Sequence, residues 1–322
     1  MARVRIASAL LAAVVALGTA SAPALGQQGV RPGLAEVHRA GDTGPVIVLI
    51  PGLGFERSVF STFIEEHEDD YRIVAVTLVG LNGEVPPNGA DGGVSGGSAD
   101  DPTPWLDDAE AGLRQLIAAE LAEARVEGDA VPAVLVGHSM GGHLAFRLAG
   151  ADGVAGIVTL DGRPVYQAPG LPDTLSAERR ARQVWRVHAD SVRRIPERTW
   201  LTSYGRTVRD GLNNRARGGS LAAEVRRKSG RALQRGYLEL LASDARPSLA
   251  AAETPVLVIA GETPNGPTGE AEVLEVWRGL MEGSGGAVDF EFVEGAGHWP
   301  LDNRPEPTTR LINNFVSEVT VE

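Results

Sequence analysis

The chain has 322 residues and no cysteine. Without thiols it can form no disulfide bond, and it has no cysteine that a lipid could modify to anchor it in a membrane. A chain of this length is nevertheless large enough to bury a sizeable core without disulfides. The sequence also contains no internal repeats. We therefore expect a folded protein that is held together by its hydrophobic core.

Long hydrophobic runs are also scarce, and the N-terminal one has a recognisable context. Arg3 and Arg5 precede an apolar run over residues 6–17, which is followed by small residues and by Ala24-Leu25-Gly26. A run of this length is too short to span a bilayer as a permanent helix. The basic start, apolar centre and small residues predict a signal peptide over residues 1–26. We expect export to the periplasm or the extracellular space, with no stable membrane anchor after cleavage.

Charge is unevenly distributed along the chain, whose net charge is −12. Residues 162–252 carry 18 Lys and Arg against 8 Asp and Glu, whereas the remainder carries 12 against 34. An acidic protein repels phosphate, so nucleic acid is not expected to be its partner. The basic segment has two interpretations: a helical module docked on an acidic body, or a surface that steers anionic substrates.

Short apolar runs bounded by turn residues recur along the chain and predict strands. Val46–Ile50 is continuously apolar, residues 57–66 favour a helix, and Tyr71–Leu78 favours the next strand. This spacing is typical of a parallel strand–helix–strand unit. Further strands are predicted at 34–39, 133–136, 154–160, 256–260 and 288–293, and further helices at 105–125, 143–149, 269–281 and 305–319. The pattern predicts an α/β fold with a mostly parallel central sheet flanked by helices.

Two segments depart from this alternation of strands and helices. Residues 82–104 are rich in Gly, Pro, Asp and Ser and predict a long loop. Residues 162–252 contain no convincing strand and predict three helices, which we place at 176–195, from Pro196 onward, and at 220–241. The expected organisation is a core formed by residues 27–161 and 253–322, with a helical cap over residues 162–252 inserted after the strand that ends at Asp161.

A serine flanked by glycines provides the first indication of chemistry. The apolar run that ends at Val136 is followed by Gly137-His138-Ser139-Met140-Gly141 and then by a predicted helix. A strand, a sharp turn with the serine, and a helix form the context of a nucleophile elbow. The small neighbours avoid collision in the turn, and the helix N-terminus favours negative charge beside Ser139. The same pattern around Ser95 has neither strand nor helix, so we interpret that segment as a loop.

A serine nucleophile requires a base within hydrogen-bonding reach. Of the six histidines, His298 is the one in a glycine-rich loop, Glu294 to Pro300, that directly follows the final predicted strand. Such a loop can return over the strand ends, where a parallel sheet places its active site. His138 and His143 lie in and just after the elbow, and we expect structural roles for them. His298 is therefore the predicted base.

These pieces resemble the α/β-hydrolase superfamily over residues 46–322. The matching motifs are Leu49-Ile50-Pro51-Gly52-Leu53-Gly54, the elbow around Ser139, and Gly297-His298. Residues 76–83 and 161–164 also resemble a branch of bacterial exported serine hydrolases with a helical cap. The resemblance implies an α/β-hydrolase fold and a Ser-His-acid triad, with the acid on the end of a strand.

The resemblance also implies an oxyanion hole, with backbone N–H donors at Met140 and Leu53. The commonest family position for the acid is occupied here by Pro264, and the nearest carboxylate is Glu262. The alternative family position is the end of the strand after the elbow helix, where Asp161 lies. Asp161 is the preferred acid and Glu262 remains the alternative.

Together these features predict a secreted serine hydrolase that cleaves carboxylic ester bonds of a small acyl substrate through Ser139, His298 and Asp161. An acyl-enzyme forms in this chemistry, and neither a metal nor an organic cofactor is required. Amide, lactone or thioester hydrolysis would use the same residues, and a non-catalytic binding protein on this scaffold is the alternative from another class. Epoxide and haloalkane chemistry uses a carboxylate nucleophile, which a serine argues against. Trp185, Trp200, Tyr204 and Tyr237 either line an apolar pocket or pack the cap on the core.

Overall fold

The computed structural model describes residues 31–81, 97–127, 132–172, 175–262 and 268–320. The predicted signal peptide over residues 1–26 lies outside these ranges, as does most of the predicted 82–104 loop, including Ser95. Those two predictions therefore stay predictions.

The centre of the fold is a mostly parallel sheet, as the sequence predicts. In the described residues its strands are β1 (Leu34–Ala40), β2 (Val46–Ile50), β3 (Arg72–Leu78), β4 (Ala133–His138), β5 (Val154–Leu160), β6 (Val256–Ala260) and β7 (Val288–Phe292). They are arranged in the order β1-β3-β2-β4-β5-β6-β7, and only β1 runs antiparallel to its neighbour. All residues of β2, β4 and β6 are buried, because helices cover both faces of a parallel sheet.

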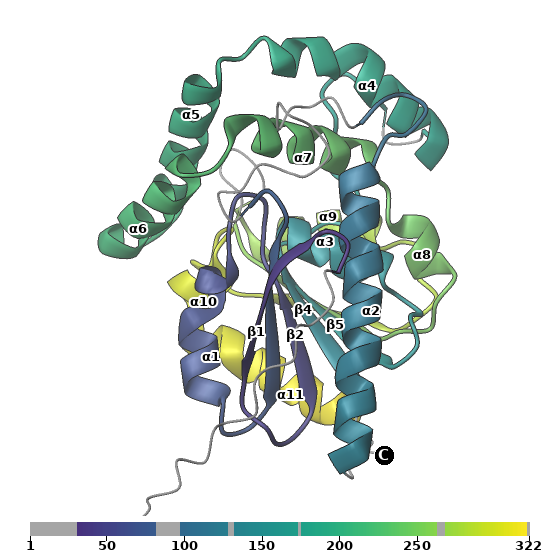
Figure 1. Ribbon diagram of the computed structural model, residues 1–322, viewed down its shortest axis with the longest axis vertical. Coiled ribbons are helices and arrows are strands. Elements are labelled where there is room, and N and C mark those ends of the chain that lie inside the picture. The colour runs from purple at the N-terminus through teal and green to yellow at the C-terminus, as the bar shows by residue number, and fades with distance from the viewer. Residues whose placement is uncertain (1–30, 82–96, 128–131, 173–174, 263–267, 321–322) are drawn as a thin grey trace, which may run out of the picture. The chain divides into compact units, whose positions relative to one another are not determined.

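Helices connect the strands and flank the sheet (Figure 1). Within the described ranges they are η1 (Arg57–Phe60), α1 (Ser61–His67), α2 (Pro104–Glu127), α3 (Met140–Arg147), α4 (Ala177–Arg193), α5 (Glu197–Asp210), α6 (Arg215–Arg226), α7 (Gly230–Ala242), α8 (Arg246–Ala250), α9 (Glu270–Leu280), α10 (Pro300–Asn303) and α11 (Pro305–Thr320). In the sequence, helices α4 to α8 all follow β5 and precede β6. Figure 1 shows α4, α5 and α7 as a layer across one end of the sheet.

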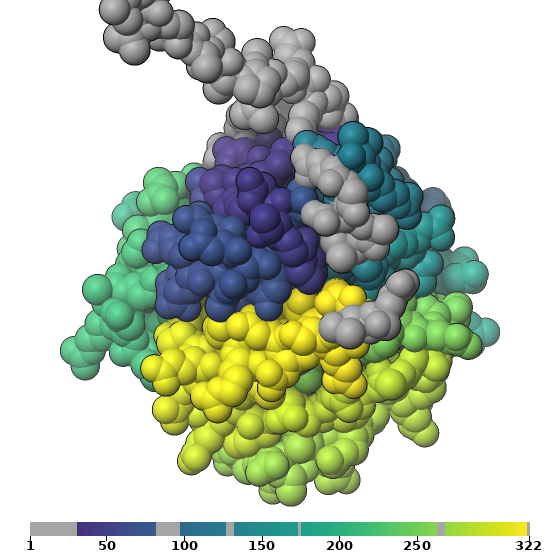
Figure 2. Space-filling model, turned by 90° about the horizontal axis from the view of Figure 1, so that it is seen from below, coloured from purple at the N-terminus to yellow at the C-terminus, as the bar shows by residue number. Residues whose placement is uncertain are grey.

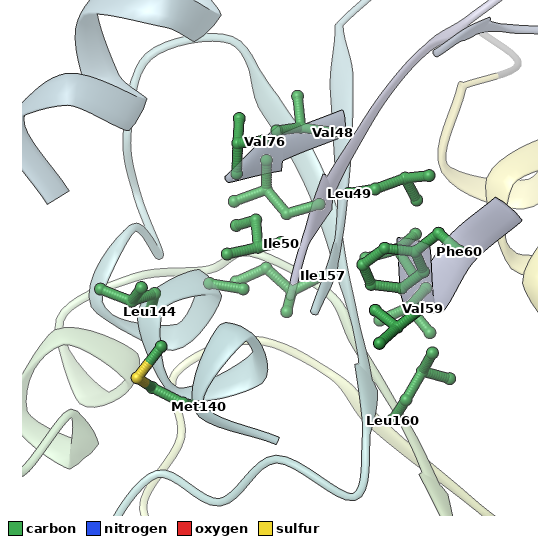
Figure 3. Packing of buried hydrophobic residues seen from close by; sticks show 14 of the residues in the cluster. Val48, Leu49, Ile50, Val59, Phe60, Val76, Met140, Leu144, Ile157 and Leu160 are labelled. Carbon is green, nitrogen blue, oxygen red and sulfur yellow. The ribbon is translucent and has the colours of Figure 1, made fainter. Parts of the chain in front are cut away.

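The core is built on both faces of the central strands. Figure 3 shows Met140 and Leu144 of α3 on one side of the strand side chains, and Val59 and Phe60 of η1 on the other. Each of these side chains is buried. Because α3 begins immediately after β4, its packing on the sheet fixes the position of the turn at Ser139 between them.

The C-terminal helix α11 packs against β5, since a Cβ on Gly156 would lie 2.7 Å from Cε1 of Phe315. Figure 2 shows the C-terminal residues in yellow beside the blue segment that contains α1. The hydroxyl of Tyr71, directly before β3, donates a hydrogen bond to Oδ1 of Asn313 at 3.1 Å.

Within the described ranges, no helix is long and apolar enough to cross a membrane.

The prediction of one helix in the inserted segment is wrong. The periodicity predicts a single helix over residues 220–241, but α6 ends at Arg226 and α7 begins at Gly230. The Ser229 hydroxyl caps α7 by accepting a hydrogen bond from the amide of Ala232 at 3.2 Å. Lys228, in the break, is buried and forms an ion pair with Glu56. The break thus coincides with a helix cap and with an ion pair to a distant loop, neither of which hydrophobic periodicity reveals.

Helix α4 accounts for part of the basic charge of the inserted segment. Val184, Trp185 and Val192 are buried on one face of this strongly amphipathic helix. The exposed arginines follow the opposite face at helical spacing and are Arg179, Arg182, Arg186 and Arg193. This arrangement favours the interpretation of a docked helical module with a solvated outer surface.

Candidate active site

The turn between β4 and α3 has the geometry of a nucleophile elbow. Ser139 has φ 54° and ψ −119°, a backbone conformation that is rare for a residue with a side chain. The turn tolerates no side chain two residues before or after Ser139, because a Cβ on Gly137 would lie 2.3 Å from the carbonyl oxygen of Gly141. A Cβ on Gly141 would lie 1.9 Å from that of Ile50. The local strain costs about 1–3 kcal/mol and is typical of functional sites.

The loop after β2 lies directly against this turn. A Cβ on Gly52 would lie 3.1 Å from both Cβ of Ser139 and Nδ1 of His138. The next residue, Leu53, is therefore close to the serine, as predicted for an oxyanion donor. Met140 is the first residue of α3, and amides in the first turn of a helix have no partner within the helix. The two predicted donors thus lie in segments that adjoin Ser139, and their role stays a prediction.

Asp161 and His298 come together from two loops: Asp161 directly follows β5, and His298 lies in the loop after β7. Nδ1 of His298 lies 2.6 Å from Oδ2 of Asp161, which is buried. Asp161 follows β5 and has φ 50°, so it and Ser139 are the two residues other than glycine with positive φ in the described chain. Its second oxygen, Oδ1, is buried without a hydrogen-bond partner there. Among the described residues, the side-chain carboxylate of Asp161 therefore makes one hydrogen bond, to the imidazole of His298.

Glu262, the alternative acid, has a different set of contacts. Its carboxylate accepts hydrogen bonds from the amides of Gly295 and Gly297, at 2.7 Å and 3.4 Å. Burial alone would raise the pKa of Glu262, but these amide hydrogen bonds lower it below its usual value. The structure thus pairs His298 with Asp161 and uses Glu262 to fasten the loop that carries His298.

His138 contacts the histidine loop rather than the serine hydroxyl. Its Nε2 lies 2.8 Å from the carbonyl oxygen of His298, which can only accept, so Nε2 carries the proton. Its ring also lies 4.9 Å from that of His298 and 4.7 Å from that of Trp299, centroid to centroid. Burial, followed by the charge of His298, lowers the pKa of His138 to about 3. His138 is therefore a neutral support for the His298 backbone.

Sequence reasoning missed Tyr166, which lies five residues after Asp161. Its hydroxyl accepts a hydrogen bond from the amide of Arg163 at 3.3 Å and also interacts with the Ser139 hydroxyl. Burial raises the pKa of Tyr166 to about 12, so the phenol stays neutral and can donate. The segment after β5 carries no motif that distinguishes Tyr166 from an ordinary core tyrosine.

A cavity of about 530 Å³ opens between the inserted helices and the loop after β2. It is lined by Leu53, Ile195, Trp200, Tyr204 and Tyr237 and by three hydroxyl side chains of α5, and none of these described residues is charged. Trp185 does not line it, since it packs between α4 and α7 and donates to the carbonyl of Pro102 at 2.9 Å. The predicted pocket aromatics therefore divide into three that line the cavity and one that packs the helices.

Two buried histidines predict a steep loss of stability in acid. Burial, followed by the charge of Arg147, lowers the pKa of His143 to about 4, and that of His138 is about 3. Both stay neutral in the folded protein but take up protons on unfolding below their ordinary pKa of about 6.5. Their contribution is complete above that pH and is lost as the pH falls from 6.5 toward 4. Near pH 5 the free energy of unfolding should fall by up to about 2.7 kcal/mol per pH unit.

Urea unfolding followed by circular dichroism at pH 7, 6 and 5 measures this slope. His143→Gln, which keeps polar atoms near the carbonyl of Arg163 and the hydroxyl of Ser243, should remove about half of it. An unchanged slope in this variant would show that His143 is not a buried neutral group.

The mostly parallel sheet and the strand–serine–helix turn at the end of its central strand, β4, define the fold as that of an α/β hydrolase. The chain belongs to the alpha/beta hydrolase family, whose model matches residues 47–311. No curated protein sequence matches the chain. In the described residues, no group of histidine and acidic side chains is arranged to hold a metal ion.

Solved structures share the fold at low sequence identity. A thermophilic esterase from Thermogutta terrifontis is 21% identical, with TM-score 0.61, and the match covers 91% of this chain and 99% of that one. A hydrolase from Pseudomonas aeruginosa is 17% identical, with TM-score 0.61 and coverage of 87% and 93%. The N-acyl homoserine lactonase AidH is 20% identical, with TM-score 0.56 and coverage of 89% and 94%. At these identities the likeness concerns the fold alone.

Proposed function

We propose that this chain is an exported serine hydrolase that cleaves carboxylic ester bonds. The observations that carry the proposal are the 2.6 Å contact between His298 and Asp161 and the strained turn at Ser139, whose amide donates to the carbonyl of Leu160, the residue before Asp161, at 3.0 Å. Membership of the alpha/beta hydrolase family supports it. Export is proposed on the sequence of residues 1–26, which has the features of a signal peptide.

In the proposed mechanism, Oγ of Ser139 attacks the acyl carbon and its proton passes to Nε2 of His298. Asp161 holds Nδ1–H of the same ring, which keeps Nε2 free to act as the base and stabilises the imidazolium that forms. The backbone amides of Leu53 and Met140 would bind the oxyanion of the tetrahedral intermediate. His298 then protonates the leaving alkoxide, and an acyl-enzyme remains on Ser139.

Water completes the proposed cycle. His298 would remove a proton from a water molecule as that water attacks the acyl carbon, and would return the proton to Oγ of Ser139. The His298 side chain is 37% exposed, so water can reach it without a large rearrangement. The carboxylic acid then leaves and the serine is restored.

The cavity beside Leu53 indicates which esters the site would accept. Its described lining is uncharged and largely apolar, and its volume of about 530 Å³ is in the range of small-molecule sites. A charged group placed there would lose its hydration without gaining a partner. We therefore propose esters with an uncharged apolar group as the substrates.

A panel of p-nitrophenyl esters of increasing acyl length, assayed beside a matched anilide and a lactone, tests this function. We expect ester turnover, with kcat/KM rising about fourfold for each methylene that enters the cavity, because burying one methylene is worth about 0.8 kcal/mol. Turnover of the anilide or the lactone alone would replace the ester assignment with the corresponding one. Absence of turnover throughout the panel would contradict the proposal.

A further inference from the structure

Tyr204 of α5 reaches from the inserted helices to the loop that carries Leu53. Its hydroxyl donates a hydrogen bond to the carbonyl oxygen of Leu53 at 2.5 Å. Its ring also lies against the loop, since a Cβ on Gly54 would be 3.0 Å from Cε1 of Tyr204. The ring of Phe55 is a further neighbour, at 6.3 Å between centroids. One side chain thus contacts three consecutive residues of the loop.

The contact falls on a turn whose conformation sets the direction of the Leu53 backbone. The amide of Phe55 donates to the carbonyl of Gly52 at 3.2 Å, and Gly54 has φ 87°, as the third residue of a type II turn requires. The peptide between Leu53 and Gly54 is the central one of this turn. Its carbonyl is the group that Tyr204 binds, while the preceding peptide carries the Leu53 N–H.

Position matters here because the same turn lies against the nucleophile. The Cβ position of Gly52 is 3.1 Å from Cβ of Ser139, so a displacement of the turn changes the distance between the Leu53 amide and the reacting carbonyl. The 3.2 Å bond that closes the turn is long and leaves room for such a displacement. A misplacement of about 1 Å at a reacting centre can cost about a hundredfold in rate.

We propose that Tyr204 is a positioning residue that holds the oxyanion-binding amide of Leu53 in place from the inserted helices. Because Tyr204 and Leu53 also line the 530 Å³ cavity, the side chain that contacts the apolar group of the substrate is the one that orders the oxyanion donor. This inference rests on the proposed function. Burial raises the pKa of Tyr204 above its usual value, so its hydroxyl remains a donor over the working pH range of an esterase.

Other contacts hold the inserted helices to the loop independently of Tyr204. The carboxylate of Glu224 on α6 accepts hydrogen bonds from the amide of Glu56 at 2.8 Å and from the hydroxyl of Ser58 at 2.6 Å. Lys228 pairs with the side chain of Glu56. Removing the Tyr204 hydroxyl therefore leaves the helices docked and tests the turn alone.

Tyr204→Phe, assayed on a p-nitrophenyl ester of the chain length that the wild type prefers, tests the inference. We expect kcat to fall about ten- to a hundredfold while KM changes less than about threefold, since the ring that contacts substrate is retained. A trifluoromethyl ketone with the same apolar group, which adds to Ser139 as an oxyanion, should bind more weakly by the factor lost in kcat/KM.

Tyr71→Phe is the matched control, because it also removes the hydroxyl of a buried tyrosine, here one that donates to Oδ1 of Asn313 at 3.1 Å, and Tyr71 does not line the cavity. Its kcat should stay within about twofold of the wild type. Gly54→Ala disturbs the same turn from the other side, through its positive φ and its contact with Tyr204, and should lower kcat as well.

Equal kcat in the wild type and Tyr204→Phe, or an equal loss in Tyr71→Phe, would overturn the role of Tyr204 and leave the proposed esterase intact. Unchanged affinity for the ketone would do the same. A wild type that hydrolyses no ester would instead overturn the proposed function, and the role of Tyr204 with it.

Discussion

Ser139→Ala is expected to lower kcat for a p-nitrophenyl ester by about 10⁵-fold, the largest effect of any substitution in this chain. Without Oγ no acyl-enzyme can form, and the remaining oxyanion donors and binding contacts support only a small residual rate. Alanine keeps the Cβ that the turn accommodates at Ser139, so the fold should be preserved. Steady-state kinetics with highly purified protein measure the effect.

Ser203→Ala is the control for this prediction. Ser203 lines the cavity on α5 and carries the same functional group, but it lies outside the strained turn. Its kcat should remain within about threefold of the wild-type value. If Ser139→Ala kept more than a tenth of the activity, another nucleophile would have to be sought.

Asp161→Asn is expected to lower kcat by about 10³- to 10⁴-fold. The amide of asparagine can donate to Nδ1 of His298, which places the proton on Nε2 and removes the base. It also cannot stabilise the imidazolium by charge. Glu262→Gln should stay within about tenfold, because a glutamine oxygen can still accept the hydrogen bond from the amide of Gly295.

The two acid variants differ from the wild type in one atom each and are compared best at the same pH and with the same ester. Their thermal unfolding midpoints serve as a check that both are folded. An Asp161→Asn enzyme within tenfold of the wild type, beside an inactive Glu262→Gln enzyme, would reverse the assignment of the acid.

The elbow could be predicted from sequence because its signals are local. The apolar strand, the glycines at 137 and 141 and the helix after Ser139 are contiguous, and the observed backbone angle of Ser139 is the one that such a turn requires. The positions of the strands along the chain followed from periodicity in the same way, whereas the single helix predicted over residues 220–241 is two helices, α6 and α7. The pairing of His298 with Asp161 agrees with the preferred acid, although the catalytic roles remain predictions.

Contacts between distant segments could not be predicted. Asp161 and Glu262 each follow a buried strand, and the path of the 294–298 loop decides which carboxylate meets the imidazole. Tyr204 lies 151 residues from Leu53, and nothing in its helix distinguishes it from the other aromatic residues there. His138 lies 160 residues from the carbonyl to which it donates. These supporting residues become visible only once the chain is folded.

The inserted helices are expected to stay docked at the end near the histidine loop. Arg217 of α6 forms an ion pair with Asp302 at 2.7 Å and donates to the carbonyl of Ser58 at 2.8 Å. Asn303 donates to the carbonyls of Gly211 and Ala296, at 3.0 Å and 2.9 Å. These contacts connect both catalytic loops of the proposed mechanism to the same insertion, which explains why α5 can wall the cavity and support the oxyanion loop together.

Covalent labelling with a fluorophosphonate tests the central claim, that Ser139 is an activated nucleophile, most directly. Intact-mass and peptide mass spectrometry on folded wild-type protein should show one adduct per chain, located on Ser139, and no adduct in Ser139→Ala. Asp161→Asn should label far more slowly than the wild type. Absence of labelling in the folded wild type, or an adduct on a different residue, would contradict the account.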